Sequence, residues 1–178
     1  MNWLDDLRTH KPCTEGYAWA KEHNIASLSE AFAKLDRGDW WLWLARAYDV
    51  DLDRPRLVTF AADCAERVLP IFEARYPEDL RPRKAIEAAR AWVACPDSET
   101  SAYADAAADA ATDAAYAATT TAAYAAAYAA DAAYAAHAAD AAYAAADAAD
   151  DAADAASYAD ERRWQTDRLR ELFPEVLA

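Results

Sequence analysis

The sequence predicts an all-α protein: a helical bundle with a tryptophan-rich N-terminal half and two or three packed alanine-rich helices in the C-terminal half. Apolar residues recur at helical spacing through the first half of the chain. Alanine, the strongest helix former, occupies 36 of the 59 positions from 101 to 159. Glycine and proline, which interrupt helices, are both missing between positions 99 and 160.

The helices of the first half and of the C-terminal tail can be placed from capping residues and helix breakers. Thr14 is expected to cap the second helix, and Ser27 with Glu30 has the spacing of a capping box. Asp39 is expected to cap the tryptophan-rich helix and to meet a nearby arginine. Pro70 is expected to kink or interrupt the long helix that contains it, with residues 71–76 continuing in the same direction. Helices are therefore expected at residues 3–8, 14–20, 27–35, 40–48, 54–69, 83–94 and 161–173.

The alanine-rich segment begins after Pro96, because a proline disfavours helix at the residue before it. A single helix of about 60 residues would be roughly 90 Å long, which is too long for a domain of this size. The phase of the non-alanine residues slips at 135–140, where we expect a turn, although a strong supercoil would also produce a slip. Three threonines at 119–121 favour a second break. The predicted parts are a helical scaffold (1–96), acidic alanine-rich helices (97–160) and a C-terminal helix packing back on the scaffold (161–178).

The net charge of −14 is concentrated in one segment of the chain. Residues 97–160 contain 12 Asp or Glu and no Lys or Arg. Such a segment repels nucleic acid and anionic membranes and attracts a basic partner protein. The candidate partner-binding residues are Asp105, Asp109, Asp113, Asp131, Asp140, Asp147, Asp150, Asp151 and Asp154.

The spacing of these aspartates admits two interpretations. Carboxylates four residues apart on a helix are about 6 Å apart along its axis, so two adjacent helices present one per about 3 Å. A DNA strand carries one phosphate per about 3.4 Å of axis, so the segment could imitate a nucleic-acid backbone. The alternative is a solvated face that keeps alanine-rich helices soluble.

Several classes of function are disfavoured by composition. With two glycines, the chain has no glycine-rich phosphate loop, and its three histidines share no metal-binding motif. The three cysteines are not paired by spacing and indicate free thiols in a reducing compartment. No apolar run approaches the roughly 18 residues that span a bilayer. We therefore expect a cytoplasmic protein that is not an enzyme and has no catalytic residues, metal or cofactor.

Three motifs of the first half occur in a fixed order and are followed by the alanine- and tyrosine-rich stretch. They are Arg37-Gly38-Asp39-Trp40-Trp41-Leu42-Trp43-Leu44, then Ala61-Ala62-Asp63-Cys64-Ala65 with Val68-Leu69-Pro70-Ile71-Phe72-Glu73, and then Arg81-Pro82-Arg83-Lys84-Ala85-Ile86-Glu87-Ala88-Ala89-Arg90-Ala91-Trp92. Together they resemble the putative immunity protein family, which is linked to bacterial toxin systems and also occurs in phage-related genomes. The resemblance covers most of the chain and is most specific at residues 81–92. It implies an all-α intracellular protein that binds and neutralises a partner, without catalytic residues.

Three functional hypotheses follow from these observations. The first is a non-catalytic inhibitor, similar to phage anti-defence and anti-CRISPR proteins, whose DNA-mimicking aspartates occupy the basic site of a nuclease or surveillance complex. The alternative is an immunity protein that neutralises a cognate bacterial toxin by direct protein–protein binding. The third is a structural module in which alanine faces pair between chains. We expect a monomer or weak homodimer that binds neither nucleic acid nor membranes directly.

Overall fold

The computed structural model describes residues 2–117, 127, 131 and 158–177. These residues form eight α-helices and one 3-10 helix and contain no strand, which confirms the all-α prediction. None of these helices combines the length and the apolar character needed to cross a membrane. The elements are α1 (Trp3–Thr9), α2 (Thr14–Glu22), α3 (Leu28–Lys34), α4 (Gly38–Ala47), α5 (Arg54–Glu73), α6 (Arg81–Ala94), α7 (Ser98–Ala117), α10 (Tyr158–Leu172) and the 3-10 helix η1 (Pro174–Leu177).

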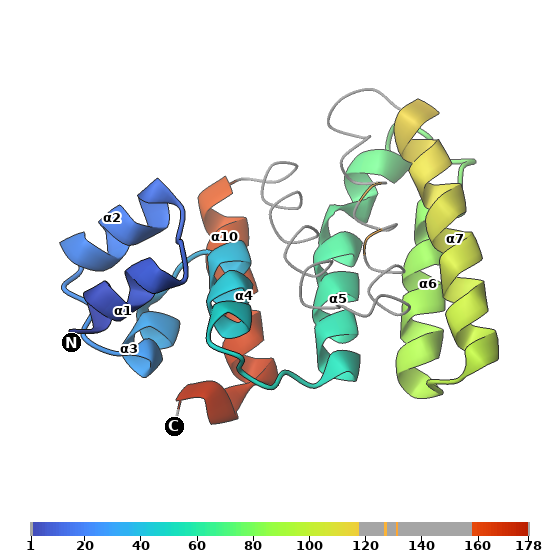
Figure 1. Cartoon of the computed structure of the whole chain (residues 1–178). Helices are drawn as coiled ribbons and strands as arrows, with labels where there is room; N and C mark the ends of the chain where they lie inside the picture. Colours follow the sequence, from blue (N-terminus) through green and yellow to red (C-terminus); the bar gives the residue numbers. More distant parts are fainter. Residues whose placement is uncertain (1, 118–126, 128–130, 132–157, 178) are drawn as a thin grey trace.

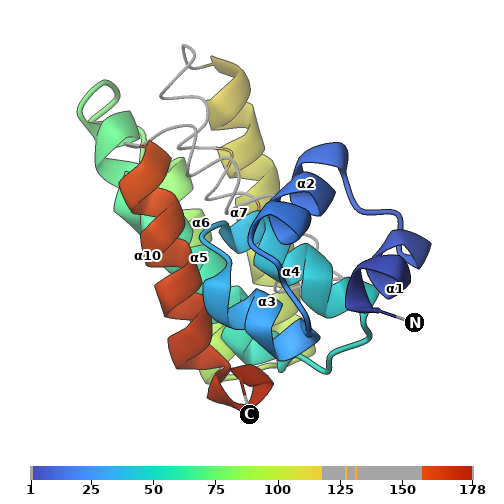
Figure 2. The same ribbon diagram turned by 90° about the vertical axis from the view of Figure 1, so that its left-hand side faces the viewer.

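Helix α5 lies at the middle of the described helices (Figure 1). Helix α6 packs against one side of α5 and carries α7 on its outer side. Helix α10 lies on the other side, where it contacts both α5 and α4 (Figure 2). The chain end therefore returns to the first half, and η1 continues the contact by packing against α3.

The expected capping box at the start of α3 is present. The Ser27 hydroxyl accepts a hydrogen bond from the Glu30 backbone N–H at 3.2 Å. The Glu30 carboxylate reaches back to the backbone N–H of Ala26 at 2.8 Å, one residue before the cap. The pKa of Glu30 is lowered, first by the hydrogen bond from the Lys34 ammonium and then by the bond from the Ala26 backbone N–H. This helix start is thus fixed by residues within one turn of each other.

Two other predicted caps are wrong. Helix α2 is capped by Cys13, whose sulfur accepts from the backbone N–H of Gly16 at 3.3 Å, and Thr14 is already helical. Helix α4 begins at Gly38, one residue before the predicted cap Asp39. The Asp39 carboxylate instead pairs with the Arg37 guanidinium at 2.6 Å. The expected contact of Asp39 with a nearby arginine is thus confirmed, and this strong charge partner two residues away replaces the expected cap bond.

Pro70 does not interrupt α5, and the expected continuation beyond it is confirmed as far as Glu73. The proline ring is exposed, whereas Leu69 and Phe72 on either side of it are buried in the core. Burial of large apolar side chains contributes about 1.5–3 kcal/mol each, which offsets the roughly 3 kcal/mol cost of an internal proline. The burial of these neighbouring side chains therefore outweighs the tendency of a proline to end a helix.

The core joins both ends of the chain around Trp41, which is fully buried. Its ring lies 4.7 Å from that of Phe32 and 6.0 Å from that of Phe173. Trp40 and Trp43, which flank it on α4, are only partly buried and pack at the edge of this core. Phe173, which directly follows α10, thus completes a core that begins in α3 and α4.

The first alanine-rich helix, α7, packs along α6. Its buried positions, spaced at three and four residues, are alanines: Ala104, Ala107, Ala108, Ala111 and Ala114. Helix α6 likewise buries alanines, and small side chains on both helices allow their axes to approach closely. The Trp92 indole N–H donates to the Ser101 hydroxyl at 3.0 Å and joins the two helices near their connection. The predicted break at 119–121 and the predicted turn at 135–140 lie outside the described residues.

Candidate partner-binding surfaces

Three of the predicted aspartates lie on α7 at four-residue spacing. Asp109 and Asp113 are exposed and Asp105 is partly buried, on the side of the helix that the buried alanines leave open. Asp131 is helical and partly buried. The other five predicted residues lie outside the described part of the chain: Asp140, Asp147, Asp150, Asp151 and Asp154. The structure therefore places a short acidic row on α7 and leaves the rest of the predicted surface untested.

This acidic row is not remote from positive charge. The pKa of Arg81, at the start of α6, is raised first by its hydrogen bonds to Asp79 and further by the charge of Asp113. The Arg81–Asp79 pair is bidentate, with nitrogen–oxygen distances of 2.9 and 2.6 Å. The sequence has no Lys or Arg within 97–160, but the packing of α7 on α6 brings the Arg81 guanidinium, from outside that segment, near the carboxylate of Asp113.

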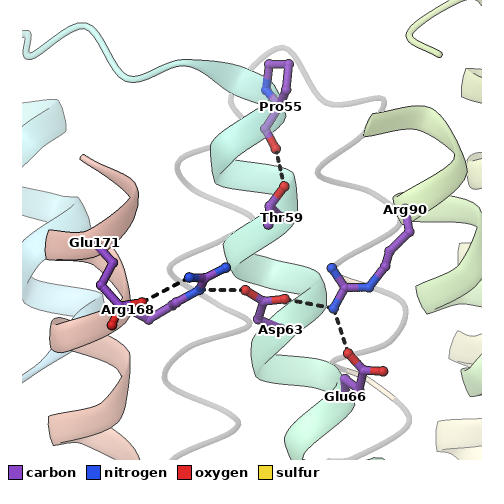
Figure 3. Close-up of polar contacts among 7 residues, drawn as sticks. All are labelled: Pro55, Thr59, Asp63, Glu66, Arg90, Arg168 and Glu171. Atoms are coloured by element: carbon purple, nitrogen blue, oxygen red, sulfur yellow. Dashed lines mark hydrogen bonds and ion pairs between the residues drawn. The ribbon is translucent and has the colours of Figure 1, made fainter. Parts of the chain in front are cut away.

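A second polar surface lies over α5, where side chains from three helices meet around Asp63 (Figure 3). The Asp63 carboxylate accepts from Arg90 of α6 at 2.7 Å and from Arg168 of α10 at 2.8 Å. Its side chain is only 15% exposed. One carboxylate of α5 thus binds a guanidinium on each flanking helix, which fixes the spacing of all three helices.

Each of these arginines binds a second, more exposed carboxylate. Arg90 donates to Glu66 at 2.6 Å, and Arg168 donates to Glu171 at 3.0 Å (Figure 3). Their side chains are 61% and 66% exposed, so these glutamates form the rim of the cluster and Asp63 forms its floor. The pKa of Arg168 is raised, chiefly by the hydrogen bond to Asp63.

The cluster borders two adjacent grooves that share Glu66. One runs between α5 and α10, where the Arg67 guanidinium stacks 4.1 Å from the Trp164 ring centre and donates to Glu161 at 2.9 Å. The other runs between α5 and α6. We call the two grooves together the α5 surface; its lining residues are Asp63, Glu66, Arg67, Leu69, Arg83, Ile86, Glu87, Arg90, Trp164, Arg168 and Glu171.

The α5 surface differs in charge from the alanine-rich segment. It carries four arginines and four carboxylates, so its formal charges sum to zero. Arginine and tryptophan are enriched at the centres of protein–protein interfaces. The described residues contain no group of three His, Cys, Asp or Glu placed to hold a metal ion. The arrangement is suited to recognising a protein by shape and hydrogen bonding.

The sequence prediction missed this surface. Asp63, Glu66 and Arg67 follow one another at the three- and four-residue spacing of one helix face, and that was the available local signal. Their partners Arg90 and Arg168 are 27 and 105 residues away from Asp63 in the chain. The helical periodicity of a sequence does not indicate contacts between residues so far apart in the chain.

Comparison with known proteins identifies one family. A family model described as Imm-5 like putative immunity protein matches residues 50–172. The matched range contains α5, α6, α7 and α10, and therefore the whole α5 surface, but not the motif at residues 37–44. Searches among curated proteins and among solved structures give no match. Because the matched range is more than half of its length, the chain belongs to the Imm-5 like putative immunity protein family.

Proposed function

We propose that this protein is a non-catalytic immunity protein that neutralises a cognate bacterial toxin by direct protein–protein binding. The observation that carries the proposal is the family match over residues 50–172. In this proposal the protein acts in the cytoplasm as a monomer or weak homodimer. It uses neither a metal nor a cofactor, because binding to the toxin is sufficient to neutralise it.

The α5 surface is the proposed contact site for the toxin. Its arginines are already held by ion pairs, so less side-chain entropy is lost when a partner binds. The Trp164 ring and the Arg67 guanidinium stacked on it provide a large contact area at the edge of one groove. The exposed glutamates Glu66 and Glu171 provide acceptors on either side of Asp63.

The test begins with the unmodified chain as bait in a lysate of its host, followed by purification of the captured toxin. Binding affinity and protection of cell growth are then measured for Glu66→Arg and Glu171→Arg. The matched control is Glu15→Arg, an exposed residue outside the family match. Reversal on the α5 surface should weaken binding by at least about tenfold, or about 1.4 kcal/mol, because it places a cation beside the existing arginines. Equal affinity and equal protection for all three variants would rule out this surface.

A second candidate is the DNA-mimicking inhibitor, favoured by the exposed row formed by Asp109 and Asp113 on α7. Its partner would be a basic nucleic-acid-binding nuclease or a CRISPR-type surveillance complex. It predicts that affinity falls steeply between about 50 and about 500 mM salt, and that DNA competes for the partner. Binding through the neutral α5 surface predicts a weak salt dependence and no competition by DNA. The double variant Asp109→Asn/Asp113→Asn should weaken binding only if the partner contacts the acidic row.

A further inference from the structure

The first four helices enclose a cavity that belongs to neither candidate surface. It has a volume of about 40 Å³ and is lined by residues of α1 to α4 and of the loop between α1 and α2. Every lining residue precedes residue 50, so the cavity lies outside the range that matches the family. Its role can therefore be separate from that of the α5 surface.

Tryptophans are the largest side chains of the cavity wall. Four of the seven tryptophans line it, namely Trp3, Trp19, Trp40 and Trp43, and each is partly buried at the edge of the core. Trp19 and Trp40 meet edge to face, with ring centres 6.5 Å apart. The rest of the wall is almost entirely aliphatic or small, and includes Leu7, Leu35 and Leu44. The four indoles contribute large apolar surfaces to the lining of this space.

Small side chains on α2 and α3 keep the space open. Ala20 and Ala31 are buried and line the cavity, where any larger residue would project into it. Gly16 also lines it, and a Cβ atom at this position would lie 3.2 Å from the Cys13 sulfur and 4.0 Å from the Trp40 ring. The exposed Cys13 is itself part of the wall, so the cavity reaches the protein surface beside α2.

Water is a poor occupant of this cavity. A buried water needs about 10–15 Å³ and two to four polar partners, and apolar cavities without such partners stay dry and take up apolar molecules. The volume is sufficient, but the wall offers almost no hydrogen-bonding group. An apolar guest would remove its own surface from water and would gain contacts with the indoles that an empty cavity lacks.

We propose that this tryptophan-lined cavity binds a small apolar molecule of a few heavy atoms. The guest is held by contact with the indole faces and enters beside Cys13. The site is independent of toxin neutralisation, since none of its residues lies in the family-matched range.

The experiment uses the full-length chain with xenon as the probe, because a cavity of about 40 Å³ is much smaller than the roughly 150 Å³ cavity known to hold benzene. Two-dimensional NMR of the indole N–H groups reports each tryptophan separately. The signals of Trp3, Trp19, Trp40 and Trp43 should shift in a saturable manner as xenon is added. The signals of Trp92 and Trp164, which do not line the cavity, should stay in place and serve as internal controls. Formamide, a small polar molecule, should produce no saturable shift.

Filling the cavity should abolish binding. In Ala31→Leu the added atoms occupy the space, so the saturable shifts should be lost. In the control Ala33→Leu, on the exposed side of the same helix, they should persist. Unchanged Trp92 and Trp164 signals establish that the filled variant is folded; if it is not, Ala20→Val, with a smaller addition, replaces it. Uniform, non-saturable shifts at all seven indoles, or saturable binding that survives in the folded filled variant, would overturn the proposal.

Discussion

The ion pairs of Asp63 make a quantitative prediction for stability. Asp63→Asn keeps the size of the side chain but removes its charge and one of its two acceptor oxygens. Arg90 and Arg168 then lose their common partner, although each retains one exposed glutamate. The substitution should therefore loosen α6 and α10 from α5 simultaneously.

The expected magnitude follows from the exposure of the three side chains. Hydrogen bonds to charged groups contribute about 1.5–3 kcal/mol, whereas exposed ion pairs contribute about 0–1 kcal/mol. The Asp63 side chain is 15% exposed, but those of Arg90 and Arg168 are 39% and 30% exposed. An intermediate value of about 1 kcal/mol for each pair gives a loss of about 2 kcal/mol. For a chain of this size that loss lowers Tm by about 4–8 °C.

Thermal unfolding followed by far-ultraviolet circular dichroism measures this change, and urea unfolding gives the free energy independently. Glu66→Gln is the matched control, because it removes a charge from the same helix and the same arginine cluster at a position that is 61% exposed. Its effect should not exceed about 0.5 kcal/mol. If Asp63→Asn is no more destabilising than Glu66→Gln, the argument that Asp63 fixes the three helices is refuted.

Three further predictions concern other parts of the fold. The Asp97 carboxylate accepts hydrogen bonds from backbone N–H groups of α7, chiefly that of Thr100, and these bonds lower its pKa from 3.8. The stabilisation of the folded protein by this carboxylate is therefore present above pH 3.8 and is lost as the pH falls through the lowered pKa. Asp97→Ala should therefore lower the unfolding midpoint at pH 7, and the difference from the unmodified chain should shrink in titrations below about pH 4. Burial raises the pKa of the Cys64 thiol well above its usual value. A disulfide reagent should therefore label the exposed Cys13 quickly and Cys64 only at the rate at which the protein unfolds. Mass spectrometry follows both reactions. Ala108→Leu should destabilise the chain by about 1–3 kcal/mol by forcing α7 away from α6, whereas Leu at the exposed position 106 should have little effect in the same urea unfolding assay.

Helix boundaries were predictable where a side chain acts on its own backbone. The capping box of Ser27 and Glu30 and the end of α10 before Pro174 are confirmed, because these groups act within about one helical turn. The predictions failed where a contact with another residue competed with the effect of a side chain on its own backbone. Asp39 makes the arginine contact that was also expected, with Arg37, and does not cap α4. Buried neighbours keep α5 uninterrupted at Pro70, and the expected continuation follows as far as Glu73.

The candidate site was less predictable than the fold. The aspartate spacing predicted an acidic row, and α7 presents Asp109 and Asp113 on its exposed side. The nearby charge of Arg81 could not be anticipated, since it depends on how α7 packs along α6. The α5 surface was missed altogether because it is assembled from three helices.

The sequence alone determined the helical class, most helix starts and ends, and the concentration of negative charge in one segment. All three depend on residue type and on spacings of a few positions, which the helical backbone converts directly into geometry. The tertiary structure alone decided that Asp63 binds arginines 27 and 105 residues away, and that four tryptophans surround one cavity. Those arrangements depend on which helix faces meet, and that is settled by burial of apolar area summed over the whole chain.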